Sequence, residues 1–482
     1  MANYIEPGAY SEVISNRSNT GGGTRLIPLI IGSGALTFQT TEAIIRGNEG
    51  MTDVLPNDNV TIVRVGVTKN GKEYDGQYDL TSDTSSNESA TNNAIKWKTS
   101  SGPDTYTVPD AGDTYYVTYY YTLSKTENKD LYDEITNIHL ITDSNQISKI
   151  YGSDLEYSRS DEEEGEATYE QKINRLAAMA DIFTETGVNT FYMLHIGCES
   201  DDPTIAEKYE DALDKYAKYV DDIWRIVPCD CVDGNTINNK ILGHIKSCST
   251  YEERKERTLV APYYTDATTA TDLISKLGGY TSGMSYDRVC ITYPDKATRY
   301  LSDGNLYELD GPFLSGLFCA MEASMSIQDS KTRASSTCFE ELKGIKMTRG
   351  EMNLLAENGV MIFEQKSGAG TPVTCRHQLT TDMSNVETKE ASIIAIKDYT
   401  SKYLRSICET YIGKYNITPD TISRVKGSVE AGLASLVANN IIISGSLTSI
   451  KQDEDNPDTL LIEVSINVPF PCNYIKLTIV VE

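Results

Sequence analysis

The sequence predicts an α+β protein of several domains, with an all-β insertion, an α/β body with a mostly parallel sheet, an α+β C-terminal core and extended strand arms at both ends. Residues 47–143 show short alternating strand patterns and no helical period. Strand and helix patterns then alternate, which favours a parallel sheet covered by helices. Both ends of the chain are rich in strand-forming residues, and 482 residues are enough for about two to four domains.

The two ends of the chain have an unusual composition. The segment 474–481 is apolar and β-branched almost to the last residue. A strand at the extreme end leaves backbone groups unpaired unless something pairs with it. Residues 9–14 are also typical of a strand, and the polar, glycine-rich segment 15–23 tethers them. Two such ends indicate a subunit that lends strands to its neighbours rather than an enzyme.

The elements between the two ends follow from residue patterns. In the insertion, alternating apolar residues predict strands near 63–67, 95–97, 106–108 and 115–121. In the body, apolar runs and stripes at helical spacing predict strands at 25–32, 190–196, 223–227, 258–261 and 288–292, and helices at 169–183, 204–221, 236–247, 268–277 and 312–323.

The C-terminal part is predicted to hold two helices and a hairpin. Thr418 and Pro419 begin the second helix in the favoured order of cap and then proline. The apolar stripe of that helix has 3-4-4-3 spacing, so one of its faces is buried. The expected order is a strand at 392–396, a helix at 399–413 capped by Asp398, the helix from Thr418, and a hairpin of strands at 441–452 and 459–468.

The composition favours a soluble globular chain. No apolar run approaches the length of a membrane span, and the first residues lack the features of a secretion signal, so we expect assembly in a cytoplasm. The net charge of −27, from 70 acidic and 43 basic residues, argues against nucleic acid and anionic membranes as partners. The ten cysteines include no CxxC pair, so free thiols are expected.

The loops after the expected parallel strands are where such a sheet would bind a nucleotide. The sequence has neither a GxGxxG nor a GxxxxGK[ST] motif, and each loop carries an acid that would repel phosphate. Dinucleotide and ATP binding are therefore not expected. The acids Asp201, Asp230 and Asp295 leave a magnesium site open, although acids after strands are more often helix caps and first-turn residues.

Other chemistries have suitable residue types without supporting patterns. His195 with Cys198, and Cys229 with Cys231, would give zinc ligands, but neither has a second pair at finger-like spacing. A Cys–His nucleophile pair lacks a flanking signature at each of the four histidines, which are His139, His195, His244 and His377.

Two segments have both a functional and a structural interpretation. The loop 453–458 is faintly similar to a calcium loop, but it lacks the spacing and the central glycine, and hairpin turns favour Asp, Asn and Pro in any case. The tyrosine-rich run 115–121 would suit a carbohydrate-binding or adhesive patch, although a strand of a surface domain is the favoured interpretation.

Several segments and their order along the chain point to one family. These are residues 4–12 with Pro7-Gly8-Ala9-Tyr10, the charged segment 253–260, residues 355–363 followed by 373–382, and the end 461–482 with Pro469-Phe470-Pro471. With the order of arm, β insertion, α/β body, helical core and terminal strand, the chain resembles contractile phage tail sheath proteins. The resemblance covers nearly the whole chain and is weakest in the insertion.

The resemblance implies a division into six parts. In chain order they are an N-terminal linking arm (1–24), the start of the sheath core (25–46), a β-sandwich or barrel insertion (47–145), an α/β body (146–345), a C-terminal sheath core (346–470) and a C-terminal linking strand (471–482).

The resemblance also implies a function. Subunits would polymerise as stacked hexameric rings around a tail tube, and contraction would drive the tube through the envelope of a target cell. The partners would be other copies of the chain, the tail tube protein, and baseplate and tail terminator proteins, with no nucleic acid, membrane or cofactor. The protein would not be an enzyme and would lie in a virion tail, assembled in the cytoplasm of a bacterial host.

The implied functional residues lie on the arms and on one helix. The terminal strands would join a sheet in neighbouring subunits, with a hinge in 15–23. The linking residues would be Tyr10, Glu12, Val13, Ile14, Tyr474, Ile475, Leu477, Ile479 and Val481, and the residues facing an acidic tube would be Lys402, Arg405 and Lys414.

Two other functions remain open from the residues alone. One is a metal-dependent enzyme on the α/β body with an accessory β domain, and the other is a surface-binding module around the tyrosine-rich insertion. The lack of a complete catalytic set of residues weighs against the first, and the lack of a secretion signal weighs against the second. Neither accounts for the terminal strands.

Overall fold

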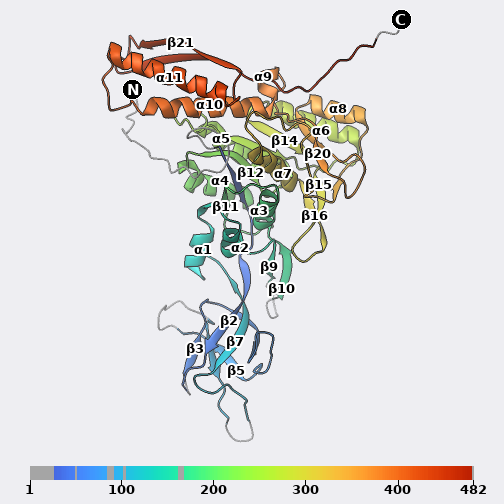
Figure 1. The fold of residues 1–482 in the computed structure, drawn as a ribbon. Coiled ribbons are helices and arrows are strands. Elements are labelled where there is room, and N and C mark those ends of the chain that lie inside the picture. The colour runs from blue at the N-terminus through green and yellow to red at the C-terminus, as the bar shows by residue number, and fades with distance from the viewer. Residues whose placement is uncertain (1–25, 49–50, 84–91, 101–104, 161–167, 480–482) are drawn as a thin grey trace.

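The computed structural model describes residues 26–48, 51–83, 92–100, 105–160 and 168–479. The molecule is elongated, with a β-rich insertion at one end, an α/β body in the middle and a helical C-terminal unit at the other end (Figure 1). It is thus a mixed α and β protein of several parts, which confirms the predicted fold class at this level. The predicted N-terminal arm lies outside the described residues.

A nine-stranded sheet forms the centre of the body, in the order β17-β20-β19-β14-β13-β12-β1-β11-β8. The strands from β19 to β11 are parallel, whereas β8, β20 and β17 pair antiparallel at the two edges, so the sheet is mostly parallel as predicted. The strands are β1 (Ile27–Gly32), β8 (Ile138–Ile141), β11 (Phe191–His195), β12 (Ile223–Pro228), β13 (Thr258–Pro262), β14 (Val289–Tyr293), β17 (Ser335–Ser336), β19 (Val360–Glu364) and β20 (Val373–Cys375).

Separate stretches of sequence build this sheet. β1 precedes the insertion in the sequence and yet lies between β12 and β11. β19 and β20 lie beyond residue 345, which is the predicted end of the body. The sheet therefore extends past the predicted boundaries 146–345, because apolar strands on either side of that stretch hydrogen-bond to it.

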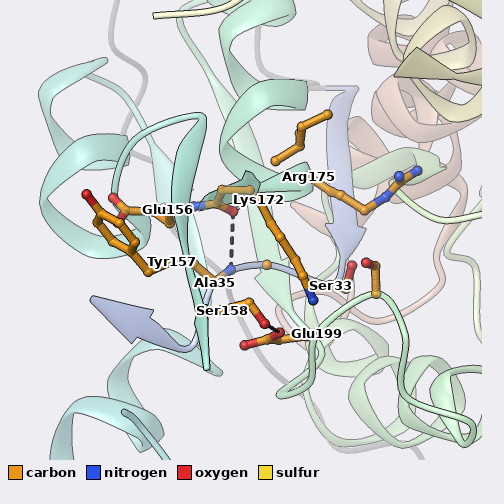
Figure 2. Close-up of a pocket in the computed structure, with 12 residues that line it drawn as sticks. Ser33, Ala35, Glu156, Tyr157, Ser158, Lys172, Arg175 and Glu199 are labelled. Carbon is orange, nitrogen blue, oxygen red and sulfur yellow. Dashed lines mark hydrogen bonds between the residues drawn. The ribbon is translucent and has the colours of Figure 1, made fainter. Parts of the chain in front are cut away.

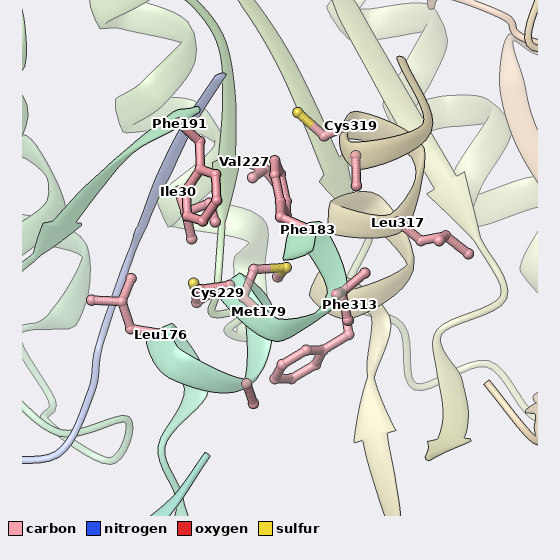
Figure 3. Packing of buried hydrophobic residues seen from close by; sticks show 14 of the residues in the cluster. Ile30, Leu176, Met179, Phe183, Phe191, Val227, Cys229, Phe313, Leu317 and Cys319 are labelled. Carbon is pink, nitrogen blue, oxygen red and sulfur yellow. The ribbon is translucent and has the colours of Figure 1, made fainter. Parts of the chain in front are cut away.

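Helices cover both faces of the sheet, and alternate strand residues point to opposite faces. On one face, Ile30 and Val227 pack with Phe183 of α3 and Phe313 of α7 (Figure 3). On the other face, Leu29 belongs to a core formed with α4, α5, α6 and α8. The helices are α2 (Asn145–Tyr151), α3 (Arg175–Glu185), α4 (Ile205–Lys215), α5 (Thr236–Cys248), α6 (Ala270–Met284), α7 (Gly311–Ser324) and α8 (Arg349–Glu357). A small separate sheet consists of β15 (Lys296–Tyr300), β16 (Leu306–Asp310) and β18 (Glu341–Lys343).

Two long paired strands, β2 (Thr37–Ile45) and β7 (Thr114–Thr122), join the insertion to the body. The buried carboxylate of Asp53 organises the core of the insertion, because it accepts hydrogen bonds from Trp97 Nε1 at 2.7 Å and from the Tyr115 hydroxyl at 2.8 Å. The remaining elements of this part and its stem are β3 (Thr52–Val54), β4 (Thr61–Gly66), β5 (Tyr78–Thr81), β6 (Ala94–Trp97), α1 (Lys129–Ile135), β9 (Leu155–Ser160) and β10 (Thr168–Ile173).

The structure corrects three element predictions in this half of the chain. No strand forms at 106–108. α1 lies inside the predicted all-β stretch 47–145. The first third of the predicted helix at 169–183 is strand, because Tyr169 in β10 stacks on Tyr120 at 4.0 Å between ring centroids and Asn174 caps the start of α3.

The C-terminal unit places two helices under a hairpin. Its elements are α9 (Val386–Lys389), α10 (Ala391–Glu409), α11 (Pro419–Ala438), β21 (Ser444–Gln452) and β22 (Leu460–Asn467). The predicted strand at 392–396 is wrong, since these residues form the first turns of α10. They are buried on every side, and a helix without a polar face presents the same continuous apolar run as a buried strand.

A buried carboxylate on α10 holds this unit against the body. Asp398 is 2% exposed and accepts hydrogen bonds from Arg288 at 2.6 and 2.8 Å and from Trp224 Nε1 at 2.8 Å. The predicted capping role of Asp398 is wrong, because it lies well inside α10. A bidentate arginine–carboxylate pair fixes orientation as well as distance, so the C-terminal unit and the sheet are joined in one geometry.

We expect Asp398→Ala to lower the free energy of unfolding by about 3 kcal/mol or more, because it leaves the Arg288 guanidinium without its partner. Urea denaturation of the purified protein measures this. Asp420→Ala is the matched control, since it removes an exposed carboxylate that pairs with Arg424 one turn away on α11, and it should cost less than about 0.5 kcal/mol. Equal losses in the two variants would contradict the role given to Asp398.

Because His195 is buried at the end of β11, we expect the stability of the body to fall at low pH. His195 is 1% exposed, its Nδ1 accepts a hydrogen bond from the Gly197 amide at 2.9 Å, and burial lowers its pKa to about 4. A histidine in the unfolded chain has a pKa of about 6.5. Between these values only the unfolded chain takes up the proton, so the stability that neutral His195 confers is full above pH 6.5 and is lost as the pH falls toward 4.

Comparison with His195→Asn tests this expectation, since an asparagine oxygen can replace Nδ1 without titrating. The stability advantage of the wild type over the variant should shrink by about 1.4 kcal/mol for each pH unit below 6.5. Urea denaturation between about pH 7 and pH 5 measures it. An advantage that stays constant over this range would rule the expectation out.

Candidate linking site

The hairpin of β21 and β22 has two open edges. Its strands pair antiparallel from Ser444 with Asn467 to Gln452 with Leu460, with a bulge after Leu447. Among the described residues no third strand pairs with either of them. An isolated two-stranded sheet is marginally stable, and its free edges offer backbone donors and acceptors to an added strand.

The two helices and the hairpin pack closely on one another. A Cβ on Gly432 of α11 would lie 2.5 Å from Ile407 Cδ1 of α10, and a Cβ on Gly445 of β21 would lie 2.9 Å from Leu433 Cδ2. Glycine at both positions therefore allows close packing of the helices and of the hairpin upon them. Alternate residues of β22, among them Val464 and Ile466, pack toward α11.

The C-terminal tail extends away from the body after β22 (Figure 1). Within the chain the predicted strand at 474–481 does not form over the described residues, because no partner strand is present there. Four of the predicted linking residues are almost fully exposed, namely Tyr474 (83%), Ile475 (87%), Leu477 (80%) and Ile479 (78%). Val481 lies outside the described residues, as do Tyr10, Glu12, Val13 and Ile14 of the other arm.

The residues that hold the root of this tail were not among those predicted. The side-chain amide of Asn473 donates to Glu390 Oε1 at 2.8 Å, and His377 Nε2 contacts the same oxygen at 2.8 Å. Glu390 immediately precedes α10 and is fully buried. No sequence pattern indicated this cluster, since its three members come from separate segments.

The three residues expected to face a tube differ in their surroundings. The guanidinium of Arg405 donates to both carboxylate oxygens of Glu256, at 2.7 and 2.5 Å. Lys402 Nζ donates to the carbonyl of Asp221 at 3.3 Å, and burial lowers the pKa of its ammonium group. Lys414 is exposed. Two of the three thus contact the body of their own chain, and a tube-facing role stays a prediction.

The acids at the carboxyl ends of the strands have structural partners. Asp230, 3% exposed, accepts from the Ser33 amide at 2.8 Å, the Ser33 hydroxyl at 2.6 Å, the Tyr209 hydroxyl at 2.7 Å and Arg175 Nε at 2.9 Å. Asp201 pairs with Lys172 at the surface. No group of three His, Cys, Asp or Glu side chains in the described ranges is placed to hold a metal ion, so the structure does not gather Asp201, Asp230 and Asp295 into a magnesium site.

A small cavity lies beside the end of β1 (Figure 2). Its volume is about 30 Å³, which is room for roughly one or two water molecules. Polar groups at its wall bond to one another, as where the Ser158 hydroxyl donates to Glu199 Oε2 at 2.5 Å. This cavity is too small for a substrate.

The other candidate residues also have structural roles. All ten cysteines are free thiols, as predicted. Tyr115 and Tyr119 are fully buried in the core of the insertion, which favours the structural interpretation of 115–121. In the part of the chain that the structure describes, no helix has the length and apolar character needed to span a membrane.

Comparison with known proteins shows what this chain is similar to. Residues 384–482 match the model of the phage tail sheath C-terminal domain. The "Tail sheath protein" of Mycobacterium phage Bxz1 is 25% identical over 373 residues, which cover 76% of this chain and 58% of that relative.

Solved structures show the same fold. The contracted baseplate of the anti-feeding prophage contains a chain with a TM-score of 0.54 and 13% identity, and the match covers 72% of this chain and 90% of that one. The contracted PVC sheath complex of an extracellular contractile injection system gives a TM-score of 0.51 with 12% identity, over 74% and 89% of the two chains. The predicted resemblance to contractile phage tail sheath proteins is therefore confirmed: residues 384–482 match the phage tail sheath C-terminal domain, and the chain is similar to a phage tail sheath protein over 373 residues.

Proposed function

We propose that this chain is a structural subunit of a contractile tail sheath, and that its copies are linked by exchanged β-strands. The observation that carries the proposal is the presence, in one chain, of a hairpin with open edges and of an exposed, strand-forming tail. The tail is too exposed to contribute to the stability of its own subunit. The hairpin packs on α11 through one face, and among the described residues its two edges have no further strand.

The side-chain pattern of the tail fits an added strand. In an extended segment Ile475, Leu477 and Ile479 lie on one side, whereas Tyr474, Lys476 and Thr478 lie on the other. On the edge of a neighbour's hairpin, the first set would continue the apolar layer that Val464 and Ile466 form over α11. The second set would face outward beside the exposed side of the hairpin.

The subunit is built to move as one piece. Asp398 with Arg288, and Arg405 with Glu256, join the C-terminal unit to the body at two points along α10. In the proposed sheath, subunits form stacked hexameric rings around a tail tube and rotate as rigid bodies during contraction. The strand links persist through this rotation and the tube is driven through the target envelope.

The proposed partners are other copies of the chain, the tail tube protein, and baseplate and tail terminator proteins. The proposed place is a virion tail, assembled in the cytoplasm of a bacterial host. The β insertion projects from the body and would lie on the outside of the sheath (Figure 1). The function needs neither a catalytic site nor a cofactor.

Substitutions on the two sides of the tail should have opposite outcomes. Ile475→Asp with Leu477→Asp should abolish polymer formation, because it places two carboxylates in the apolar layer of the neighbour. Lys476→Asp with Thr478→Asp is the matched control, since it adds the same two carboxylates to the outward side, and it should still polymerise. Electron microscopy and sedimentation of the purified protein measure both.

Two results would count against strand exchange. One is polymer formation by the variant with the substituted apolar side. The other is normal polymerisation of a chain that lacks residues 474–482. Both variants should remain folded as monomers, because these residues are exposed and lie outside the cores described above.

The tube-facing prediction is best tested at Lys414, whose side chain is exposed. If it faces an acidic tube, Lys414→Glu should weaken co-sedimentation with the tube protein, and added salt should reduce the difference from the wild type. Lys366→Glu makes the same charge change at an exposed site on the body and should leave co-sedimentation unchanged. Equal behaviour of the two variants would remove Lys414 from the contact.

A further inference from the structure

The root of the C-terminal tail is attached to the body at one polar cluster. Asn473 donates to Glu390 Oε1 at 2.8 Å, and every described residue after it is exposed. Glu390 is fully buried at the junction of α9 and α10, and Gln378 Nε2 lies 3.4 Å from its other oxygen. Three segments therefore meet on one carboxylate: the stretch after β20, the start of α10 and the end of the chain.

The chemistry of the cluster makes Asn473 a specific partner. A buried carboxylate needs hydrogen-bond donors, and within this cluster they come from His377, Gln378 and Asn473. His377 Nε2 lies 2.8 Å from Glu390 Oε1 and 3.1 Å from the side-chain nitrogen of Asn473, so the imidazole belongs to the same polar cluster. The side-chain nitrogen of Asn473 then has Glu390 as its acceptor. An aspartate at 473 would have the same shape but would add a second acceptor and a second negative charge.

The segment between β22 and Asn473 has little conformational freedom. Pro469 and Pro471 have fixed φ angles, and each proline also restricts the residue before it. The backbone N–H of Asn473 donates to the Pro471 carbonyl at 3.0 Å, and this hydrogen bond closes a tight turn just before Tyr474. Because this segment is stiff and is held at both ends, the tail leaves the subunit in one direction.

We propose that Glu390 and Asn473 are positioning residues that fix where, and in which direction, the C-terminal tail leaves the subunit, so that the tail is presented to a second copy of this chain in one orientation. This inference rests on the proposed exchange of strands. In addition to strand exchange, the contact between Asn473 and Glu390 determines the point at which the tail leaves the subunit, which a flexible linker would not do.

Proteolysis of the unassembled full-length chain tests the anchor without assembly. Tyr474 is 83% exposed and offers chymotrypsin a cleavage site directly after the anchor, and cleavage there also requires Asn473 to enter the binding groove of the enzyme. Asn473→Ala and Asn473→Asp should both raise the rate of cleavage there, by about tenfold, because loss of a hydrogen bond to a charged group favours local opening. Asn467→Ala removes an exposed asparagine at the end of β22 and should leave the rate unchanged.

The aspartate variant separates anchoring from simple packing. If only the shape of residue 473 mattered, Asn473→Asp would be cleaved at the wild-type rate, and this result would overturn the proposal. Assembly gives the second measurement: the concentration needed for polymers should rise about tenfold in Asn473→Asp, since a tail without a fixed exit must be ordered on binding.

Failure of the anchor and failure of strand exchange give different results. If removal of residues 474–482 abolishes polymers while Asn473→Asp matches the wild type in cleavage and assembly, the anchor is wrong and strand exchange stands. If that removal leaves polymers unchanged, strand exchange is wrong, and the anchor loses its proposed role even where cleavage after Tyr474 responds to the variants.

Discussion

The hydrogen bonds between Asp398 and its two partners determine how the two halves of this molecule sit together. The C-terminal unit has a small core of its own, formed by two helices and one face of a hairpin. Asp398 joins that unit to β12 through Trp224 and to the start of β14 through Arg288. The hairpin edge and the root of the tail thereby acquire a fixed position relative to the large sheet.

Open strand edges are a hazard for a soluble protein, because they invite uncontrolled pairing between copies. This chain limits the hazard in two ways. Its net charge of −27 keeps copies apart except where many contacts form together. The bulge after Leu447 also interrupts the regular edge of β21, whereas the pairing of β22 is regular over Leu460–Asn467. In the proposed assembly, geometry and charge together select ordered linkage over aggregation.

Sequence patterns predicted the parts of the fold that depend on local chemistry. Thr418 followed by proline marked the start of α11, and apolar runs marked the strands of the body. Patterns failed where tertiary contacts decide the outcome. Residues 392–396 look like a strand because the first turns of α10 are buried all round. The pairs of Asp398 with Arg288 and of Asn473 with Glu390 join distant segments, so local sequence carries no sign of them.

In the proposed sheath, contacts within a subunit stay rigid, whereas contacts between subunits have to survive the rotation of the subunits. Charged side-chain pairs such as Arg405 with Glu256 depend on orientation and are lost when their partners rotate by a few tens of degrees. Strand pairing uses the backbone, so in the proposed sheath it can persist while the subunits rotate. A subunit that turns against its neighbours should therefore keep its ion pairs inside the chain and use backbone pairing between chains. Arg405 follows this pattern, because its guanidinium pairs with Glu256 of the same chain.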